Sequence, residues 1–292
     1  MATTIAKAFD EFSESITPTA DKMADVRARR DTVIGYLKAA FPSGANVQYC
    51  SGQLVGSFGR YTAARPFDDV DVLAHLHVDD PLWSSKYMYD STDFLYRVRR
   101  ALNDATAIKK VGARGQAVRL FYTDGLSVDV AAVVKYTTGG YGIPDGAGGW
   151  LSTDPLRHEA YLNEQNGKLS GDLKRVIRFA KKWNRAHSSR MTSFHVEMLV
   201  ARTFGSLGGN SRQALQLFYQ YNYNNLSVQD PAGYSGDLSS YLDWTSRAAV
   251  NASLSVAFDR ATKAISAEDS GNHAEAIRLW RIILGSDFPT YG

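Results

Sequence analysis

The chain has 292 residues, 44% of them hydrophobic and 22% charged, and a formal net charge of +3. This length can bury a large core in one or two domains. The mild charge argues against strong nucleic-acid binding, which needs many phosphate contacts from lysine and arginine. One cysteine excludes an internal disulfide and a multi-cysteine zinc site. Without a bilayer-spanning apolar run or a signal-peptide pattern, we expect a cytoplasmic protein with no membrane partner.

Apolar spacing predicts helices within residues 1–41, a strand at 47–50, a second strand at 70–78 and a helix at 90–105. Asp124-Gly125 between two apolar runs predicts a hairpin with strands at 116–122 and 126–134. The glycine-rich residues 139–149 are expected to form a mobile loop at a domain boundary. Helices are then expected at 173–186, 193–204, 212–221, 250–265 and 274–284.

A Gly56-Ser57 pair stands shortly before Asp69-Val70-Asp71. Side chains at i and i+2 of a strand project from the same face, so both carboxylates can share divalent ions while Val70 points into a core. A Gly-Ser pair alone is commonly a turn, and an Asp-x-Asp alone is often a solvated strand end. Their order and close spacing predict a site for a metal ion and a triphosphate.

Asp129 is the third carboxylate of this pattern, and it interrupts the strongly apolar run 126–134. An unpaired buried charge is costly, so this carboxylate is expected to face a cation. Three carboxylates can hold two divalent ions for in-line nucleotidyl transfer. Their oxygen ligands suit Mg²⁺, with Mn²⁺ as an alternative.

These residues occur with Thr62 and with the segments 150–155, 176–184 and 193–197 in the order seen in bacterial CD-NTases. Over residues 45–290 the chain resembles these cyclic GMP-AMP synthase and oligoadenylate synthetase-like enzymes. The resemblance implies a bilobal α+β fold. Residues 1–150 would form a polymerase-β-like nucleotidyltransferase core with a mixed sheet and N-terminal helices. Residues 151–292 would form a helical lobe that completes the nucleotide cleft.

The resemblance also assigns roles. Asp69, Asp71 and Asp129 match the catalytic, metal-binding acids. The residues expected to bind nucleotide are Gly56, Ser57, Arg60, Thr62, Lys181 and Ser193. Of these, Gly56 and Ser57 match the donor-phosphate turn, while Lys181 and Ser193 match residues that reach the donor triphosphate from the helical lobe. Arg60 is expected to compensate for Gly59, which replaces a basic residue of the family.

Several assignments have plainer alternatives. Asn163 and Asn166 carry amides that can read the edge of an acceptor base, or they cap helices. Lys181 shares a helical stripe with Lys174 and Arg178, as a solvated surface residue also would. The basic residues between 97 and 119 are interpreted as mostly solvated surface. His195 is expected to be a packing residue and not a base.

The resemblance implies a template-independent nucleotidyltransferase that makes a cyclic di- or oligonucleotide second messenger and releases pyrophosphate. Its substrates would be nucleoside triphosphates (ATP, with GTP, UTP or CTP as further candidates). In CBASS antiphage signalling the product acts on a separate effector protein. Two alternatives stay open: another polymerase-β-like transferase, acting on tRNA, poly(A) or an antibiotic, and a catalytically silent nucleotide-binding subunit.

Residues 285–292 are expected to form a short, solvent-facing and mobile tail. Some CD-NTases end in a residue that ubiquitin-transfer-like partner enzymes conjugate to a target. Gly292 resembles such a residue, because a glycine has no side chain to hinder its carboxylate. The alternative is an incidental terminus.

Overall fold

The computed structural model describes residues 2–67, 69–103 and 110–292. The chain forms two compact units, which are described separately. The sheet unit comprises residues 19–60 and 67–159, and the helical unit comprises residues 1–18, 61–66 and 160–292. The boundary that the sequence predicts at residue 150 therefore lies inside the sheet unit, near its end.

The sheet unit is built on a mixed sheet with the strand order β1-β2-β5-β4-β3, to which β6 and β7 add through β5. The predicted mixed α+β fold is confirmed, because β2 and β5 run parallel while the other pairs are antiparallel. The strands are β1 (Val47–Leu54), β2 (Asp69–Val78), β3 (Lys110–Arg114), β4 (Ala117–Phe121), β5 (Ser127–Lys135), β6 (Tyr141–Pro144) and β7 (Trp150–Thr153).

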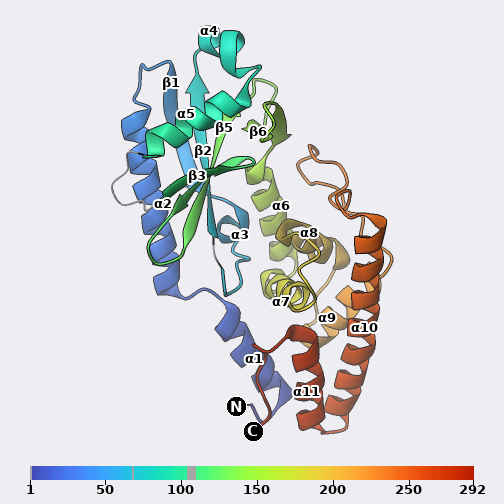
Figure 1. Ribbon diagram of the computed structural model, residues 1–292. Coiled ribbons are helices and arrows are strands. Elements are labelled where there is room, and N and C mark those ends of the chain that lie inside the picture. Colours follow the sequence, from blue (N-terminus) through green and yellow to red (C-terminus); the bar gives the residue numbers. More distant parts are fainter. Residues whose placement is uncertain (1, 68, 104–109) are drawn as a thin grey trace. The chain divides into compact units, whose positions relative to one another are not determined.

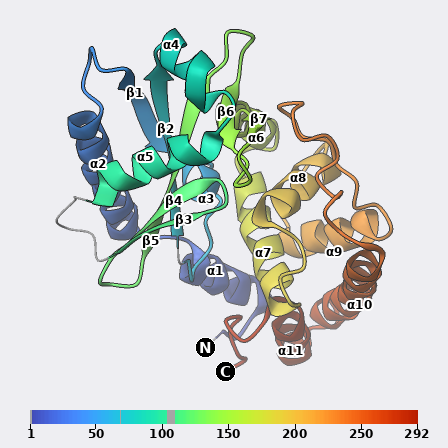
Figure 2. The same ribbon diagram turned by 45° about the horizontal axis from the view of Figure 1, so that its top comes forward.

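Helices α2 (Ala20–Ala40) and α5 (Ser91–Asn103) contact each other and pack against this sheet (Figures 1 and 2). The one-turn helix α3 (Gly56–Gly59) follows β1, and α4 (Asp80–Leu82) with the π-helical turn η1 (Trp83–Tyr87) follows β2. Alternate residues of β2, from Val70 to Leu76, are completely buried. This alternation places the opposite face of the strand, with its polar residues, away from the apolar core.

The hairpin predicted at Asp124-Gly125 is confirmed, since β4 and β5 pair antiparallel across it. Gly125 has φ +88°, a left-handed conformation that glycine adopts without a Cβ clash. The expectation of a loop over residues 139–149 is wrong in part. β6 lies within this stretch, and the Asp145 carboxylate accepts hydrogen bonds from the backbone N–H groups of Ala147 and Gly149. The glycines thus serve a tight turn between paired strands.

The helical unit contains α1 (Ile5–Ile16), most of α6 (Pro155–Lys168), α7 (Leu173–Ala186), α8 (Ser193–Thr203), α9 (Ser211–Asn222), α10 (Trp244–Asp269) and α11 (His273–Leu284). Its core is aromatic. Phe9 of α1 lies 5.5 Å from Phe179 and 5.0 Å from Trp280 between ring centroids. Because α1 buries its apolar face on this core, the first helix of the chain belongs to the helical unit. None of the helices in the described ranges is long and apolar enough to cross a membrane.

The prediction of a solvent-facing, mobile tail is wrong for Phe288. The Phe288 ring is completely buried, 5.1 Å from the centroids of both Phe9 and Phe12. The Gly292 N–H donates to the Ala2 carbonyl at 3.4 Å, and the two termini lie together in both views (Figures 1 and 2). Gly292 itself is exposed. Its conjugation to a partner stays a prediction.

Candidate active site

The three predicted acids lie on two neighbouring parallel strands. Asp69 and Asp71 stand on β2, and the β5 register places Asp129 directly opposite Asp71. Residues paired across a sheet project from the same face, and so do residues two apart on one strand. The structure therefore gathers the three carboxylates at one end of the sheet. Asp69 is exposed, whereas Asp71 and Asp129 are partly buried.

The backbone at Gly56 lies directly against the Asp71 carboxylate. The Val55 N–H donates to the Asp71 carbonyl at 3.0 Å, which ties the start of α3 to β2. A Cβ added at Gly56 would lie 1.8 Å from Asp71 Oδ2, and φ at this residue is +60°. Only a glycine meets both conditions. The turn and the acids that the sequence separates by about a dozen residues thus form one local structure.

The glycine at position 59 also has a steric explanation. A Cβ at this position would meet the Leu54 carbonyl oxygen at 2.6 Å, so a basic residue here requires a backbone shift. Arg60 follows it, is 7% exposed, and contributes a charge that opposes the rise in the pKa of Asp71. Arg60 thus brings a positive charge near Asp71, and its compensation for the family's basic residue stays a prediction.

The electrostatics of Asp71 are unfavourable in the protein alone. Burial, followed by the negative charges of Asp69 and Asp129, raises its pKa from 3.8 to about 6, despite the opposing effect of Arg60 and Arg119. Burial and like charges both disfavour the carboxylate form. A cation placed among the three acids would relieve both effects.

Arg119 is a site residue that the sequence analysis missed. Its Nε donates to Asp129 Oδ1 at 2.6 Å, its Nη2 donates to Asp129 Oδ2, and the same nitrogen lies 3.5 Å from Asp69 Oδ2. The interpretation of this arginine as solvated surface is wrong, because its side chain is only 20% exposed. The sequence contained a signal for this contact. Arg119 and Asp129 are equidistant from Asp124, so the predicted hairpin pairs them.

The donor chemistry of these acids fits a hard divalent cation, since carboxylate oxygens are the ligands that Mg²⁺ prefers. The raised pKa of Asp71 supports the fit. In the described ranges, however, no three carboxylate, imidazole or thiolate groups converge into a metal-binding cluster. Arg119 instead bridges two of the three acids. Asp69 and Asp129 are therefore bound by a guanidinium group in this structure.

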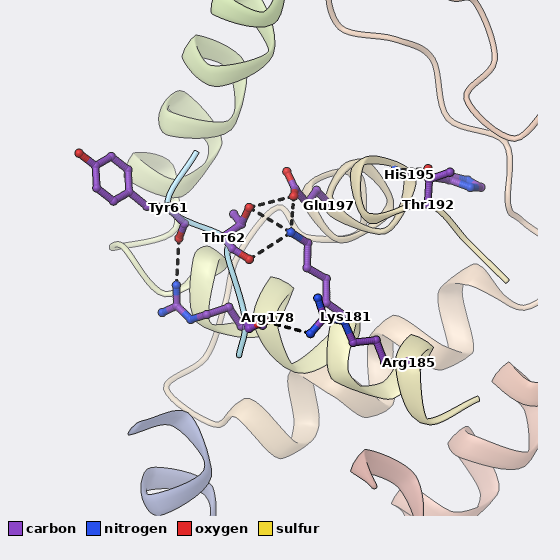
Figure 3. A network of polar contacts seen from close by, with 9 residues as sticks. Tyr61, Thr62, Arg178, Lys181, Arg185, Thr192, His195 and Glu197 are labelled. Atoms are coloured by element: carbon purple, nitrogen blue, oxygen red, sulfur yellow. Dashed lines mark hydrogen bonds and ion pairs between the residues drawn. The ribbon is translucent and has the colours of Figure 1, made fainter. Parts of the chain in front are cut away.

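Lys181 is buried in the helical unit, which contradicts its interpretation as a solvated helix charge. Its side chain is 4% exposed, and Nζ lies 2.5 Å from Glu197 Oε1. The ammonium also donates to the Thr62 carbonyl at 3.1 Å and to Thr62 Oγ1 at 3.2 Å (Figure 3). Thr62 and Glu197 are both completely buried. Sequence reasoning did not assign a role to Glu197, although it stands one turn after Ser193.

Ser193 is exposed at the first residue of α8, where Thr192 caps the helix by accepting from the His195 N–H. His195 is confirmed as a packing residue. Its ring is completely buried, with Nε2 2.8 Å from the Leu226 carbonyl and Nδ1 3.0 Å from the Tyr241 hydroxyl. Burial lowers the pKa of this imidazole.

The two asparagines hold the connection between α6 and α7. Asn163 Oδ1 accepts from Lys174 Nζ at 2.6 Å, and Asn166 Oδ1 accepts from the Lys174 backbone N–H at 3.2 Å. These contacts agree with the helix-capping alternative for Asn166. Base reading by either amide stays a prediction.

Comparison with known proteins finds a matching family model and related chains. Residues 3–166 match the family model described as the Second Messenger Oligonucleotide or Dinucleotide Synthetase domain. A Bacillus cereus (strain VD146) protein named "Probable cyclic nucleotide synthase" is 26% identical over 100% of this chain and 99% of its own length. An Acinetobacter cyclic AMP-AMP-AMP synthase is 28% identical over 81% of this chain and 72% of its own length.

Two solved structures share the fold. CdnC of Escherichia coli MS115-1, solved in a complex with a HORMA protein, superposes with a TM-score of 0.79 at 19% identity, covering 97% of this chain and 98% of CdnC. The Vibrio cholerae cyclic AMP-GMP synthase DncV gives a TM-score of 0.76 at 14% identity, covering 95% and 94%. With the family model matching more than half of its length, this chain is a nucleotidyltransferase that belongs to the Second Messenger Oligonucleotide or Dinucleotide Synthetase family.

Proposed function

We propose that this protein joins nucleoside triphosphates, ATP among them, and closes the product into a cyclic di- or oligonucleotide with release of pyrophosphate. The observation that carries the proposal is the contact between the Gly56 backbone and the Asp71 carboxylate, opposite Asp129. Nucleotidyl transfer needs a triphosphate-binding turn next to metal-binding acids, and the contact of Gly56 with Asp71 supports these roles for the two segments. The name of the Acinetobacter relative, a cyclic AMP-AMP-AMP synthase, supports ATP as a substrate.

The proposed roles divide by residue. Asp69, Asp71 and Asp129 would hold Mg²⁺, or Mn²⁺ in its place. When bound, two such ions stabilise the attacking and leaving oxygens of an in-line displacement. The backbone N–H groups of the Gly56 turn would donate to phosphate oxygens, and the Ser57 hydroxyl can donate to them as well. Lys181 and Ser193 lie in the helical unit, and their contact with the triphosphate stays a prediction from the resemblance.

Arg119 and Arg60 have electrostatic roles in this proposal. Both oppose the rise in the pKa of Asp71, so they favour the ionised form of this carboxylate. Arg119 also fixes the orientation of the Asp129 carboxylate through two parallel hydrogen bonds. The third acid therefore stays in place before a cation arrives.

The test incubates the purified protein with each nucleoside triphosphate, singly and mixed, in MgCl₂, then treats the products with phosphatase and weighs them by mass spectrometry. A phosphatase-resistant cyclic product, absent with Asp71→Asn, supports the proposal. Linear, phosphatase-sensitive products would point to another nucleotidyltransferase. Triphosphate binding without any product would indicate a silent subunit.

We further propose that the product is a signal read by a separate effector protein in antiphage defence. The family description supports this, because a second messenger acts only through a receptor. The same mass spectrum identifies the nucleotide, which can then be tested for activation of candidate effectors. An effector activated equally well by the linear intermediate would contradict the need for ring closure.

A further inference from the structure

Residues 61–66, called the strap here, connect α3 to β2 but group with the helical unit. Basic side chains on one face of α7 hold the strap by its carbonyl oxygens (Figure 3). Arg178 Nη1 donates to the Tyr61 carbonyl at 2.9 Å, and Arg185 Nη1 donates to the Ala64 carbonyl at 3.0 Å. Lys181 lies between them in sequence and donates to the carbonyl of Thr62.

The contacts of Lys181 form a closed ring with the strap. Its Nζ lies 2.5 Å from Glu197 Oε1 and 3.2 Å from Thr62 Oγ1, and that hydroxyl donates to Glu197 Oε1 at 2.8 Å. An ammonium group has three protons, and the Thr62 carbonyl supplies a third acceptor. These three acceptors match the hydrogen-bonding capacity of Lys181.

The burial of this ion pair needs an explanation other than stability. Two charges removed from water rarely recover their desolvation cost, and apolar side chains of similar volume often serve a core equally well. What an ion pair with defined hydrogen bonds adds is a unique geometry. Here that geometry fixes Nζ against the strap, which leads to Asp69 in one direction of the chain and to the Gly56 turn in the other.

We propose that Glu197 is a positioning residue for nucleotidyl transfer. It holds the Lys181 ammonium against Thr62 and so fixes the strap that connects the phosphate turn to the catalytic acids. Glu197 acts through Lys181 and touches no reacting atom. The inference rests on the proposed function for its catalytic consequence, whereas its structural part can be tested without any activity.

The experiment compares Glu197→Gln with Glu268→Gln. Gln keeps the shape of Glu197 and removes its charge. Glu268 pairs with Arg212 in the same unit at 2.8 Å, so its variant also loses one ion pair there. The structural readout is hydrogen exchange at the Arg65 amide, which donates from the strap to the Ile16 carbonyl at 2.8 Å. The kinetic readout is the KM for nucleoside triphosphate set against kcat.

We expect Glu197→Gln to speed exchange of the Arg65 amide at least about tenfold, while Glu268→Gln leaves it as in the wild type. KM should rise at least about tenfold and kcat should change less than about threefold, because a displaced strap weakens triphosphate binding in ground and transition states alike. Glu197→Asp, which keeps the charge, should fall between Glu197→Gln and wild type. Equal exchange and kinetics in the Glu197→Gln and Glu268→Gln proteins would overturn the proposal.

A paired variant covers the case in which Glu197→Gln does not fold. Lys181→Met with Glu197→Leu removes both charges and keeps apolar packing. It should fold, yet show the same fast Arg65 exchange. Wild-type exchange in this variant would show that the pair only fills space, and the proposal would be wrong. If the wild type makes no nucleotide, the proposed function fails while the exchange data still decide the role of Glu197.

Discussion

Asp71 in the sheet unit and Glu197 in the helical unit are both carboxylates close to basic side chains, but their charges are balanced differently. Glu197 is completely buried, and Lys181 and Thr62 meet its oxygen directly. Asp71 is only partly buried, faces two other acids, and has a pKa raised to about 6. The charge of Glu197 is balanced, so this residue can hold Lys181 and Thr62 in a defined arrangement. The negative charge of Asp71 is not balanced by its neighbours, which is the property of a cation-binding site.

The largest expected effect comes from Asp69→Asn or Asp71→Asn. Either change should lower the rate of synthesis by about 10³-fold or more, equivalent to about 4 kcal/mol, because the ions lose an anionic ligand. The measurement is product formation with ATP and MgCl₂, alongside circular dichroism to verify folding. Near-wild-type turnover would show that these acids are not catalytic. The proposed difference in role between Asp71 and Glu197 would then be wrong.

Gly56→Ala should lower kcat/KM by about 10²-fold, about 2.7 kcal/mol, since the new Cβ would meet Asp71 Oδ2 at 1.8 Å and φ is positive. Gly35→Ala in α2 is the control, because a Cβ there meets nothing within 4 Å. That control should keep full activity and gain up to about 1 kcal/mol of stability from helix propensity. Equal activity of the two variants would show that the turn and the acid do not act together.

The pH dependence of stability follows from the raised pKa of Asp71. An acid whose pKa is higher in the folded state binds protons more tightly there, so its favourable contribution is complete below 3.8 and is lost as the pH rises through about 6. Asp71→Asn should therefore raise the free energy of unfolding by about 3 kcal/mol at pH 8 in EDTA and leave it unchanged near pH 3.5. Denaturant unfolding at the two pH values measures this difference.

If Asp71→Asn stabilises the protein equally at both pH values, the raised pKa of Asp71 is not the cause of the stabilisation. For Glu197 the comparison predicts the reverse sign. Glu197→Gln should destabilise the protein at pH 8, because it leaves the buried Lys181 without its anionic partner.

Arg119→Gln gives the smallest expected effect. Loss of its charged hydrogen bonds to Asp129 should lower the stability of the metal-free protein by about 1.5 kcal/mol. Addition of MgCl₂ should then raise Tm more than in the wild type, because the cation replaces the missing guanidinium charge. Differential scanning fluorimetry with and without MgCl₂ measures both shifts. A smaller Mg²⁺ shift in the variant would mean that Arg119 helps to form the cation site.

Local patterns in the sequence determined much of the fold. The alternation in β2, the Asp-Gly turn before β5 and the periodicity of α7 each depend on residues close in the chain, so strands, hairpin and helix could be predicted to within a few residues. The grouping of Asp69, Asp71 and Asp129 could also be predicted, because i, i+2 spacing on a strand fixes a shared face and a buried charge needs a partner.

Only the tertiary structure determined which acidic and basic side chains pair with each other. Arg119 was interpreted as solvated surface, but strand pairing places it on Asp129. For Lys181, the solvated alternative is excluded because α8 supplies Glu197. Phe288 was predicted to lie in a mobile tail, and no contact between the strap and α7 was predicted, but both are held by residues more than 100 positions away. Contacts over such separations depend on how the whole chain packs. Local periodicity depends only on residues close in sequence, so it cannot specify the distant partner of a buried charge.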